Sequence, residues 1–205
     1  MPLTTGPSRP QDGRSTNEDA YSLGRSPVPH ALLCDGPGAA SRAAARAVKL
    51  FLTLFNQAPM TDLGQFQTWI HWAHLPDSAL LGGPQSTFLA LACLGSRVLG
   101  ACAGDSRLYL LPREGGPRIL TEGAAKDRLG SGRVTPFPIH QQVGSGDVLL
   151  LMSDGAWTPL NLARLRAIRS KSPSRHISEF PLMLLDEAGR SGRADDMTVV
   201  ALAIP

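Results

Sequence analysis

Residues 86–103 read STFLALACLGSRVLGACA, and they contain the clearest structural signal in the chain. Two apolar runs, 86–94 and 97–103, have the length and the composition of buried β-strands. Gly95-Ser96 stands between them and suits the two-residue turn of a β-hairpin. These residues therefore predict two antiparallel strands joined by a tight turn.

Other apolar runs of strand length occur along the chain, at residues 19–23, 30–34, 107–112, 147–152 and 197–204. Short connections such as GRSPVP, between the first two runs, favour the pairing of consecutive strands. Gly104-Asp105-Ser106, before the run at 107–112, has the composition of a further tight turn. We therefore expect mostly antiparallel sheets in which sequential pairing dominates.

Apolar residues at helical spacing occupy the segments between the strands. Residues 39–56 place alanine, valine, leucine and phenylalanine side chains on one stripe of a helix. A second helix is expected to start at Thr61-Asp62, a typical N-cap pair, and further helices are expected at 159–168 and 178–189. Two blocks of strands with helical insertions between them predict an α+β protein with two packed sheets and helices outside.

The composition is that of one globular domain. With 205 residues, of which 42% are hydrophobic and 18% charged, the chain is long enough for a full core. Twenty basic and seventeen acidic residues give a net charge of +3, which is too small for the field of a nucleic-acid-binding protein. Residues 1–16 are rich in Pro, Gly and Ser and should lack regular structure. We therefore expect a flexible N-terminus over 1–13 and a single domain over 14–205.

The cysteines and the hydropathy pattern predict a soluble cytoplasmic protein. Cys34, Cys93 and Cys102 are odd in number, have no CxxC spacing and lie inside apolar runs, which favours buried free thiols in a reducing compartment. The first thirty residues contain no apolar stretch of signal-peptide length. No window approaches the ~18 consecutive apolar residues of a membrane span.

Five acidic residues stand where apolar runs begin or stop. Asp35, Asp105 and Asp154 follow such runs, whereas Asp19 and Asp195 precede them. A carboxylate at the end of a buried strand leaves the core as the chain meets solvent, so several strand ends on one rim can converge on a shared cation. Mg²⁺ and Mn²⁺ prefer oxygen ligands. The pattern therefore predicts a metal site at one rim of the packed sheets.

Six motifs give the chain its resemblance to a known family. RSTNEDAYSL, ALLCDGPG, STFLALA, ACAGDSRLYLL, DVLLLMSDGAW and ADDMTVVALAI have the order and approximate spacing of the metal-dependent type 2C protein phosphatases, over residues 14–204. The chain resembles a compact bacterial-type member. The resemblance implies a four-layer αββα sandwich with two Mn²⁺ or Mg²⁺ ions, which hydrolyses phosphoserine and phosphothreonine by attack of a metal-bridging hydroxide. It also implies that the partners are phosphorylated proteins, the substrates of a Ser/Thr kinase, and we expect a monomer.

The resemblance assigns the ion ligands residue by residue. It implies that Asp35 bridges both ions, that the carbonyl of Gly36 binds one of them, and that Asp154 and Asp195 bind the other. Short, rigid aspartates suit this task better than mobile glutamates, and the glycine lets its carbonyl approach a cation. Asp196 stands where relatives usually have asparagine, and we keep Asp195 as the ligand.

Further residues receive supporting roles from the same resemblance. Glu18 and Asp19 are expected to hold metal-bound waters, and Arg14 to bind phosphate, because a planar guanidinium matches two phosphate oxygens. Asp105 lies where relatives place a ligand for a third ion, but it also suits a tight turn that caps a hairpin. The turn role is favoured, because Thr158 stands where many relatives carry another aspartate for that ion.

Two features depart from the family pattern. Pro37 replaces a histidine that protonates the leaving oxygen in many eukaryotic relatives, so another donor is needed, and a metal-bound water could serve. Ser131 to Gly146 is short where relatives commonly insert a longer flap. We expect a more open cleft and shallow substrate selectivity as a result.

Three alternatives to the phosphatase remain. A catalytically silent phosphoprotein-binding module is suggested by Pro37, Thr158 and the short flap, although intact ligands oppose it. A sporulation-type phosphatase is suggested by the same flap and the DDMT ending, whereas the GDSR and NED motifs oppose it. A nucleic-acid binder would use the basic stretch 164–176, which lacks interleaved aromatic residues.

Overall fold

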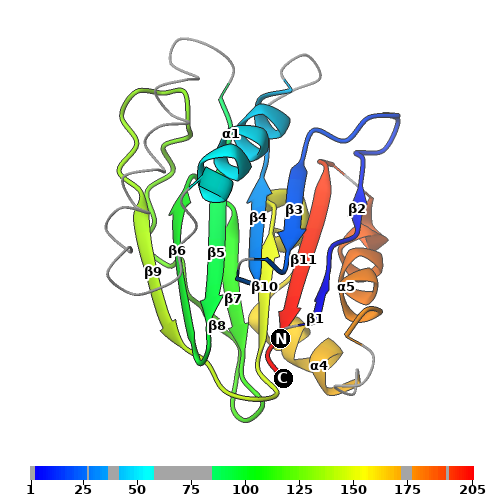
Figure 1. The fold of residues 1–205 in the computed structure, drawn as a ribbon. Coiled ribbons are helices and arrows are strands. Elements are labelled where there is room, and N and C mark those ends of the chain that lie inside the picture. Colours follow the sequence, from blue (N-terminus) through cyan, green and yellow to red (C-terminus); the bar gives the residue numbers. More distant parts are fainter. Residues whose placement is uncertain (1–2, 27, 37–41, 58–84, 172–176, 193) are drawn as a thin grey trace.

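Two antiparallel β-sheets lie face to face in the computed structural model, which describes residues 3–26, 28–36, 42–57, 85–171, 177–192 and 194–205 (Figure 1). In its described part, one sheet has the order β3 (Ala20–Gly24), β4 (His30–Cys34), β5 (Phe88–Leu94), β6 (Arg97–Ala103), β9 (Phe137–Gln142). The other has the order β1 (Leu3–Thr5), β11 (Met197–Ala203), β10 (Val148–Met152), β7 (Arg107–Leu111), β8 (Arg118–Ile119), and β2 (Ser8–Arg9) also pairs with β11.

The alternation of side chains along the strands explains why the sheets are buried on both faces. In β5, Leu89 and Leu91 point into the layer between the sheets, whereas Phe88 and Ala90 point to the outer side. The strand β10 from the other sheet adds Leu149 to the layer between the sheets. Strands of a sandwich that is covered on both sides have no face in solvent, so their sequences are continuous apolar runs.

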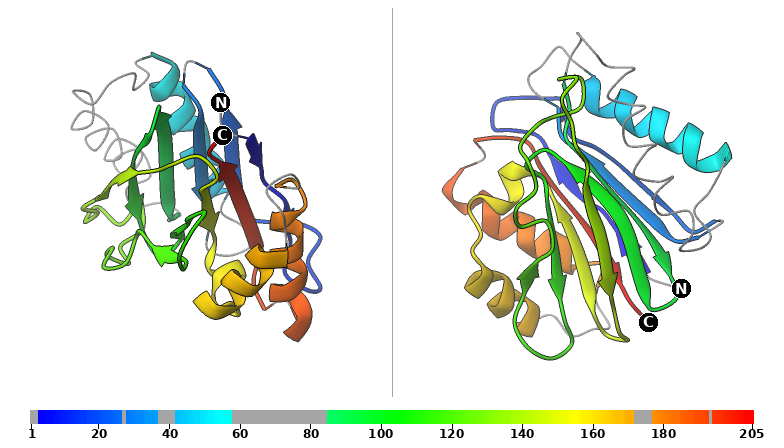
Figure 2. Two further views of the ribbon diagram at one scale, coloured as in Figure 1. Left: turned by 90° about the horizontal axis from the view of Figure 1, so that it is seen from below. Right: turned by 90° about the vertical axis from the view of Figure 1, so that its left-hand side faces the viewer.

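Helices cover both outer faces, as the two turned views show (Figure 2). The helix α1 (Ala43–Gln57) packs on the β3–β9 sheet through a stripe that includes Phe51 and Phe55. The helices α3 (Asp154–Trp157), α4 (Leu162–Lys171) and α5 (Phe180–Ala188), followed by the 3-10 turn η3 (Gly189–Ser191), lie by the other sheet. The predicted α+β fold, a four-layer αββα sandwich, is confirmed.

The predicted hairpin at 86–103 is confirmed, but the next turn is not a hairpin. Leu94 pairs with Arg97 across Gly95, which has a φ of 61°. The strand β6 pairs with β5 and β9, whereas β7 pairs with β10 and β8 in the other sheet. Gly104-Asp105-Ser106 therefore carries the chain from one sheet to the other, and the expected sequential pairing is wrong here. The expected cap of a hairpin at Asp105 is wrong for the same reason.

The described residues bear on two other expectations, and a third falls outside them. Residues 1–16 are not devoid of regular structure, because β1 and β2 pair with β11 and satisfy the backbone groups of its edge. The short segment from Ser131 to Gly146 contains β9, which pairs with β6 as an edge strand. The helix expected from Thr61-Asp62 lies outside the described residues.

The cysteine prediction holds, and Cys34, Cys93 and Cys102 are buried free thiols. In the described ranges, no helix has both the length and the apolar character needed to cross a membrane.

The sheet topology brings the acidic strand ends to one edge of the sandwich. The strands β4, β6 and β10 all finish at this edge, which is the upper one in Figure 1. The strands β3 and β11 begin there, because they are antiparallel to β4 and β10. Residues that lie more than one hundred positions apart in sequence therefore meet at one rim.

Candidate metal centre

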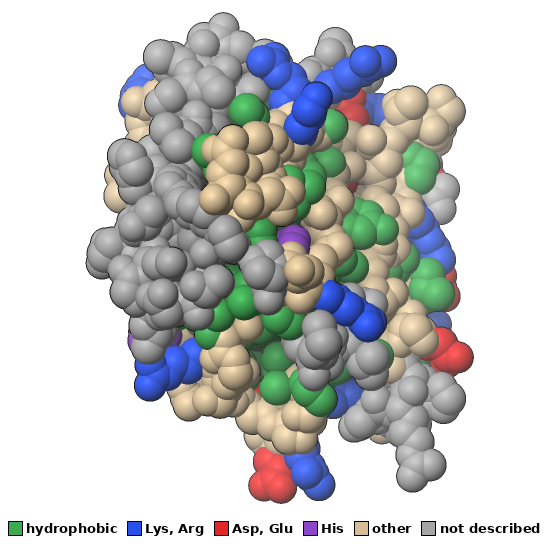
Figure 3. Space-filling view, viewed as in Figure 1, with side chains coloured by type: hydrophobic (Ala, Val, Ile, Leu, Met, Phe, Trp, Pro, Cys, Tyr) green, Lys and Arg blue, Asp and Glu red, His purple; other side chains and the backbone are tan. Residues whose placement is uncertain are grey.

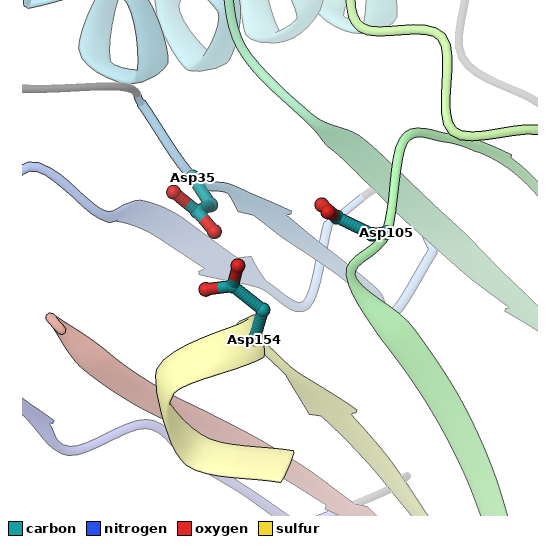
Figure 4. A group of neighbouring side chains, drawn as sticks. All are labelled: Asp35, Asp105 and Asp154. Atoms are coloured by element: carbon teal, nitrogen blue, oxygen red, sulfur yellow. The ribbon is translucent and has the colours of Figure 1, made fainter. Parts of the chain in front are cut away.

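Three carboxylates face a common space at this edge. Asp35 follows β4, Asp105 lies in the connection between β6 and β7, and Asp154 begins α3 directly after β10. One carboxylate oxygen from each lies within 4.8 Å of the others, and the three side chains point toward one another (Figure 4). Carboxylates this close repel one another unless they share protons or a cation.

Buried hydroxyl groups fix the backbone of Asp35. Its N–H donates to Oγ1 of Thr87 at 2.9 Å, and its carbonyl accepts from the N–H of Thr87 at 2.8 Å and from Oγ of Ser86 at 3.1 Å. Oγ1 of Thr87 is also hydrogen-bonded to Oγ of Ser106 at 2.7 Å. Ser86 and Thr87 therefore position the loops that carry Asp35 and Asp105.

Two glycines allow the loops to approach closely. Gly104 has a φ of 93°, and a Cβ there would lie 2.8 Å from Cγ2 of Thr87. A Cβ on Gly155 would lie 2.2 Å from the carbonyl oxygen of Asp196. Both contacts are too short for any other residue, so the loop of Asp105 and the start of α3 are held against their neighbours by glycine.

Ser153 joins Asp19 to the start of α3. Its Oγ donates to Oδ2 of Asp19 at 2.7 Å and accepts the N–H of Thr198 at 2.9 Å. The other oxygen of Asp19, Oδ1, is buried without a hydrogen-bond partner among the described residues. Asp19 thus lies just behind Asp154 with one acceptor still available.

The electrostatics of the site call for a positive charge. Burial raises the pKa of Asp35 to about 9, helped by the charges of Asp19 and Asp154. Burial also raises the pKa of Asp19 to about 7, and it raises that of Asp154 together with the charges of Asp195 and Asp105. Without a cation, Asp35 would hold a proton near neutral pH and Asp19 would hold one in part, whereas a bound divalent cation would keep both ionised.

Asp35 gives the most direct test of whether a metal fits. Its side chain is 8% exposed, and its Oδ2 has no hydrogen-bond partner in the described part of the chain. A buried carboxylate oxygen without a partner is costly in a folded protein. Since Oδ2 belongs to a side chain that faces two other carboxylates, the donor set suits an oxygen-liganded divalent ion.

The structure separates the two adjacent aspartates before β11. Asp196 is buried, and its carboxylate accepts the N–H groups of Gln11 and Glu18, both at 2.6 Å. Asp195 is exposed and lines a cavity of about 350 Å³ together with Asp154. Asp196 therefore anchors the N-terminal segment, and Asp195 is the one of the two that faces the open site. Asp195 is not part of the three-carboxylate group, and its role as a ligand stays a prediction.

The other predicted residues lie around this group. Arg14 is exposed, and its charge partly offsets the rise that burial causes in the pKa of Glu18. The backbone of Glu18 runs past Gly36, where a Cβ would lie 3.3 Å from its carbonyl oxygen. Thr158 is exposed and lines the cavity beside Asp154. Pro37 lies outside the described residues.

Arg128 is a residue of the site that the sequence analysis missed. Its Nη2 donates to Oδ1 of Asp105 at 3.2 Å, and both side chains are largely buried. The charge of Arg128 also lowers the pKa values of Asp35 and Asp154, in opposition to their burial. The sequence offers no local signal for this contact, since Arg128 is one of many scattered arginines.

A second cavity of about 350 Å³ opens on the other side of Asp154, with Asp105, Trp157 and Lys126 in its lining. Nε1 of Trp157 donates to the carbonyl of Asp105 at 2.9 Å, and the guanidinium of Arg107 stacks 3.4 Å above the Trp157 ring. The carboxylate group is therefore reached from an open, polar cavity and has a rigid aromatic wall beside it.

Comparisons with known proteins support the fold. No family profile and no curated protein sequence matches the chain. Among solved structures, the chain is similar to the catalytic domain of the serine threonine protein phosphatase PstP in complex with two manganese ions, with a TM-score of 0.83, 24% identity, and coverage of 100% of this chain and 99% of that one. It is also similar to the serine/threonine phosphatase PstP/Ppp of Mycobacterium tuberculosis, with a TM-score of 0.82, 23% identity, and 99% and 98% coverage.

A third similar structure is the serine/threonine phosphatase Stp1 of Staphylococcus aureus, with a TM-score of 0.89, 18% identity, and 100% and 96% coverage. Nearly the whole of each chain is superposed in all three cases. The chain therefore has the fold of these bacterial phosphatases.

Proposed function

We propose that this chain is a metal-dependent protein serine/threonine phosphatase of the type 2C family, with a single catalytic domain that also includes the strands β1 and β2 before residue 14. The observation that carries this proposal is the convergence of Asp35, Asp105 and Asp154 on one space, with a buried carboxylate oxygen that lacks a partner. The shared fold of similar phosphatases supports it, as does the match of six motifs in order.

In this proposal, two Mn²⁺ or Mg²⁺ ions are held by Asp35, the carbonyl of Gly36, Asp154 and Asp195. When bound, these ions would neutralise the charge of a phosphate monoester and supply the activated water that attacks phosphorus. The chain fixes the position of the Asp35 ligand, because Oγ1 of Thr87 accepts the backbone N–H of Asp35 at 2.9 Å.

The remaining residues act on water and on the substrate. Glu18 and Asp19 orient water molecules from behind the ligands, and the available Oδ1 of Asp19 suits that task. Arg14 binds two phosphate oxygens of the substrate and holds phosphorus in line for attack. Hydrolysis then releases the serine or threonine hydroxyl and inorganic phosphate.

The expected substrates are proteins phosphorylated by a Ser/Thr kinase, acted on by a monomer in the cytoplasm. Lys and Arg side chains stand along the upper edge of the surface in Figure 3, which is the edge that carries the acidic strand ends. Basic side chains at the edge that carries the acidic strand ends favour the approach of an anionic phosphopeptide.

Hydrolysis of para-nitrophenyl phosphate and of a phosphothreonine peptide, with Mn²⁺ and with EDTA, tests this function. We expect activity with Mn²⁺, none with EDTA, and a loss of at least ~100-fold in Asp35→Asn, since a metal ligand is removed. Asp186→Asn is the matched control, because its side chain is 64% exposed and its ion pair within the described residues is with Arg9, away from the carboxylate group.

Activity that survives chelation would refute the metal mechanism. Phosphopeptide binding without hydrolysis in Mn²⁺ would instead identify the silent binding module. The exposed hydroxyl of Thr158, in place of a carboxylate, is the feature that favours this second candidate.

A further inference from the structure

Arg128 forms an ion pair with one carboxylate of the group. Its guanidinium contacts Asp105 at 3.2 Å, and the two side chains are only 21% and 27% exposed. A guanidinium is charged at all accessible pH values, so it acts as a permanent cation in the site. Asp105 therefore has a positively charged partner within the protein, whereas the other two carboxylates face open space.

The backbone of Arg128 is fixed by the same residues that hold Asp35. The next residue, Leu129, is fully buried and forms a β-bridge with Ser86, with N···O distances of 2.8 and 3.1 Å. Ser86 in turn donates from Oγ to the carbonyl of Asp35 at 3.1 Å. The backbone next to Arg128 and the backbone of Asp35 are therefore both hydrogen-bonded to Ser86.

Asp105 is held in place from the opposite side. Its carbonyl accepts from Nε1 of Trp157 at 2.9 Å, and the neighbouring Ser106 is hydrogen-bonded to Thr87 at 2.7 Å. The backbone is therefore held by hydrogen bonds on both sides of the Asp105–Arg128 pair. A divalent ion bound to Asp105 would lie beside the positive charge of the guanidinium.

We propose that Arg128 is the resident cation of the metal centre and takes the position that an additional divalent ion would occupy at Asp105. This inference rests on the proposed function, because it concerns the number of ions that the phosphatase binds. Arg128 is a positioning residue: it holds Asp105 and balances one negative charge without contacting the reacting atoms. Asp35, Asp154 and Asp195 remain available for two ions.

Mn²⁺ binding to the metal-free protein tests this proposal, with stoichiometry measured by isothermal titration calorimetry and by equilibrium dialysis. The wild-type chain should bind two ions. Arg128→Met, which keeps the length of the side chain but removes its charge, should bind one more. Arg128→Lys should return the number to two, because the ammonium supplies the charge again. Arg118→Met is the matched control, since Arg118 is an exposed arginine on β8, and it should bind two ions.

A double variant identifies where the additional ion binds. Arg128→Met combined with Asp105→Asn should bind two ions again, because the freed carboxylate is then missing. Circular dichroism in EDTA shows which variants are folded, and Arg128→Lys and Asp105→Asn keep the test valid if Arg128→Met does not fold. In that case, two ions in each of these variants support the proposal, and a third ion in Arg128→Lys contradicts it.

Two results would overturn the proposal and leave the proposed function intact. One is a wild-type stoichiometry of three that Asp105→Asn reduces to two, since the guanidinium would then yield to a metal ion. The other is an unchanged stoichiometry of two in a folded Arg128→Met variant. A wild-type chain that binds no Mn²⁺ would overturn both this proposal and the metal-dependent function.

Discussion

Replacing Thr87 by valine tests how the fold holds the metal site. Thr87 is fully buried, and its Oγ1 accepts the N–H of Asp35 at 2.9 Å and is hydrogen-bonded to Ser106 at 2.7 Å. Valine has the same shape but cannot accept a hydrogen bond, so the buried N–H of Asp35 would lose its partner. An unsatisfied buried group costs ~1–3 kcal/mol.

The loss should appear in both stability and activity. For a domain of this size, each 1 kcal/mol lowers the melting temperature by about 2–4 °C, so a loss of about 2 kcal/mol lowers it by roughly 4–8 °C. Asp35 would also be less well oriented, and a displacement of about 1 Å in a catalytic site can reduce the rate ~100-fold. We therefore expect kcat/KM for para-nitrophenyl phosphate with Mn²⁺ to fall by roughly 10- to 100-fold.

Two variants serve as controls for Thr87→Val. Thr87→Ser keeps the hydroxyl and should retain most of the activity. Thr53→Val removes an exposed hydroxyl on α1, which donates to the carbonyl of Lys49 at 2.9 Å, and should change neither quantity appreciably. Thermal unfolding in EDTA separates stability from metal binding. A Thr87→Val protein with the melting temperature and kcat/KM of the wild type would show that this hydroxyl does not hold Asp35.

Three other outcomes are expected. Gly155→Ala should lower the free energy of unfolding in urea by ~1–3 kcal/mol, because its Cβ would lie 2.2 Å from the Asp196 carbonyl oxygen; an unchanged midpoint would contradict this close approach. Burial lowers the pKa of His30 in the folded protein, so the unfolded chain binds more protons below pH ~6.5. The free energy of unfolding should therefore be greatest above that pH and decline below it. His30→Gln should weaken this pH dependence, and an equally steep decline in that variant would exclude His30 as its source. Mn²⁺ at 100 times its Kd should stabilise the wild type by ~2.7 kcal/mol, and Asp154→Asn should lose most of this gain in a thermal shift assay; an equal shift in both proteins would argue against Asp154 as a ligand.

The strands could be predicted because their signal is local. The run 30–34 is recovered as β4 with the same ends, and the hairpin of β5 and β6 follows from two apolar runs around Gly95-Ser96. These strands are covered on both faces, so they read as continuous apolar runs. The strand β9 (Phe137–Gln142) was missed because its burial alternates and its residues include proline, histidine and glutamine.

The candidate site was predicted in part for a similar reason. Asp35 and Asp154 stand directly after apolar runs, and the fold brings both to the same edge. The neighbourhood of Asp105 could not be predicted, because the chain crosses there between two sheets rather than turning within one. The roles of Asp195, Arg14 and Gly36 remain predictions for the experiments above.

The sequence by itself determined the layered α+β fold, the central apolar strands and the acidic residues at their ends, because apolar periodicity and turn composition act over a few neighbouring residues. Only the tertiary structure decided which groups share the site. Arg128 meets Asp105 at 3.2 Å, and Asp196 receives the N–H of Gln11 from 185 positions away. Such contacts depend on how two sheets and their loops are packed, and no local pattern encodes them. The physical reason is that charge pairing and desolvation act through space, between residues that are far apart in the sequence.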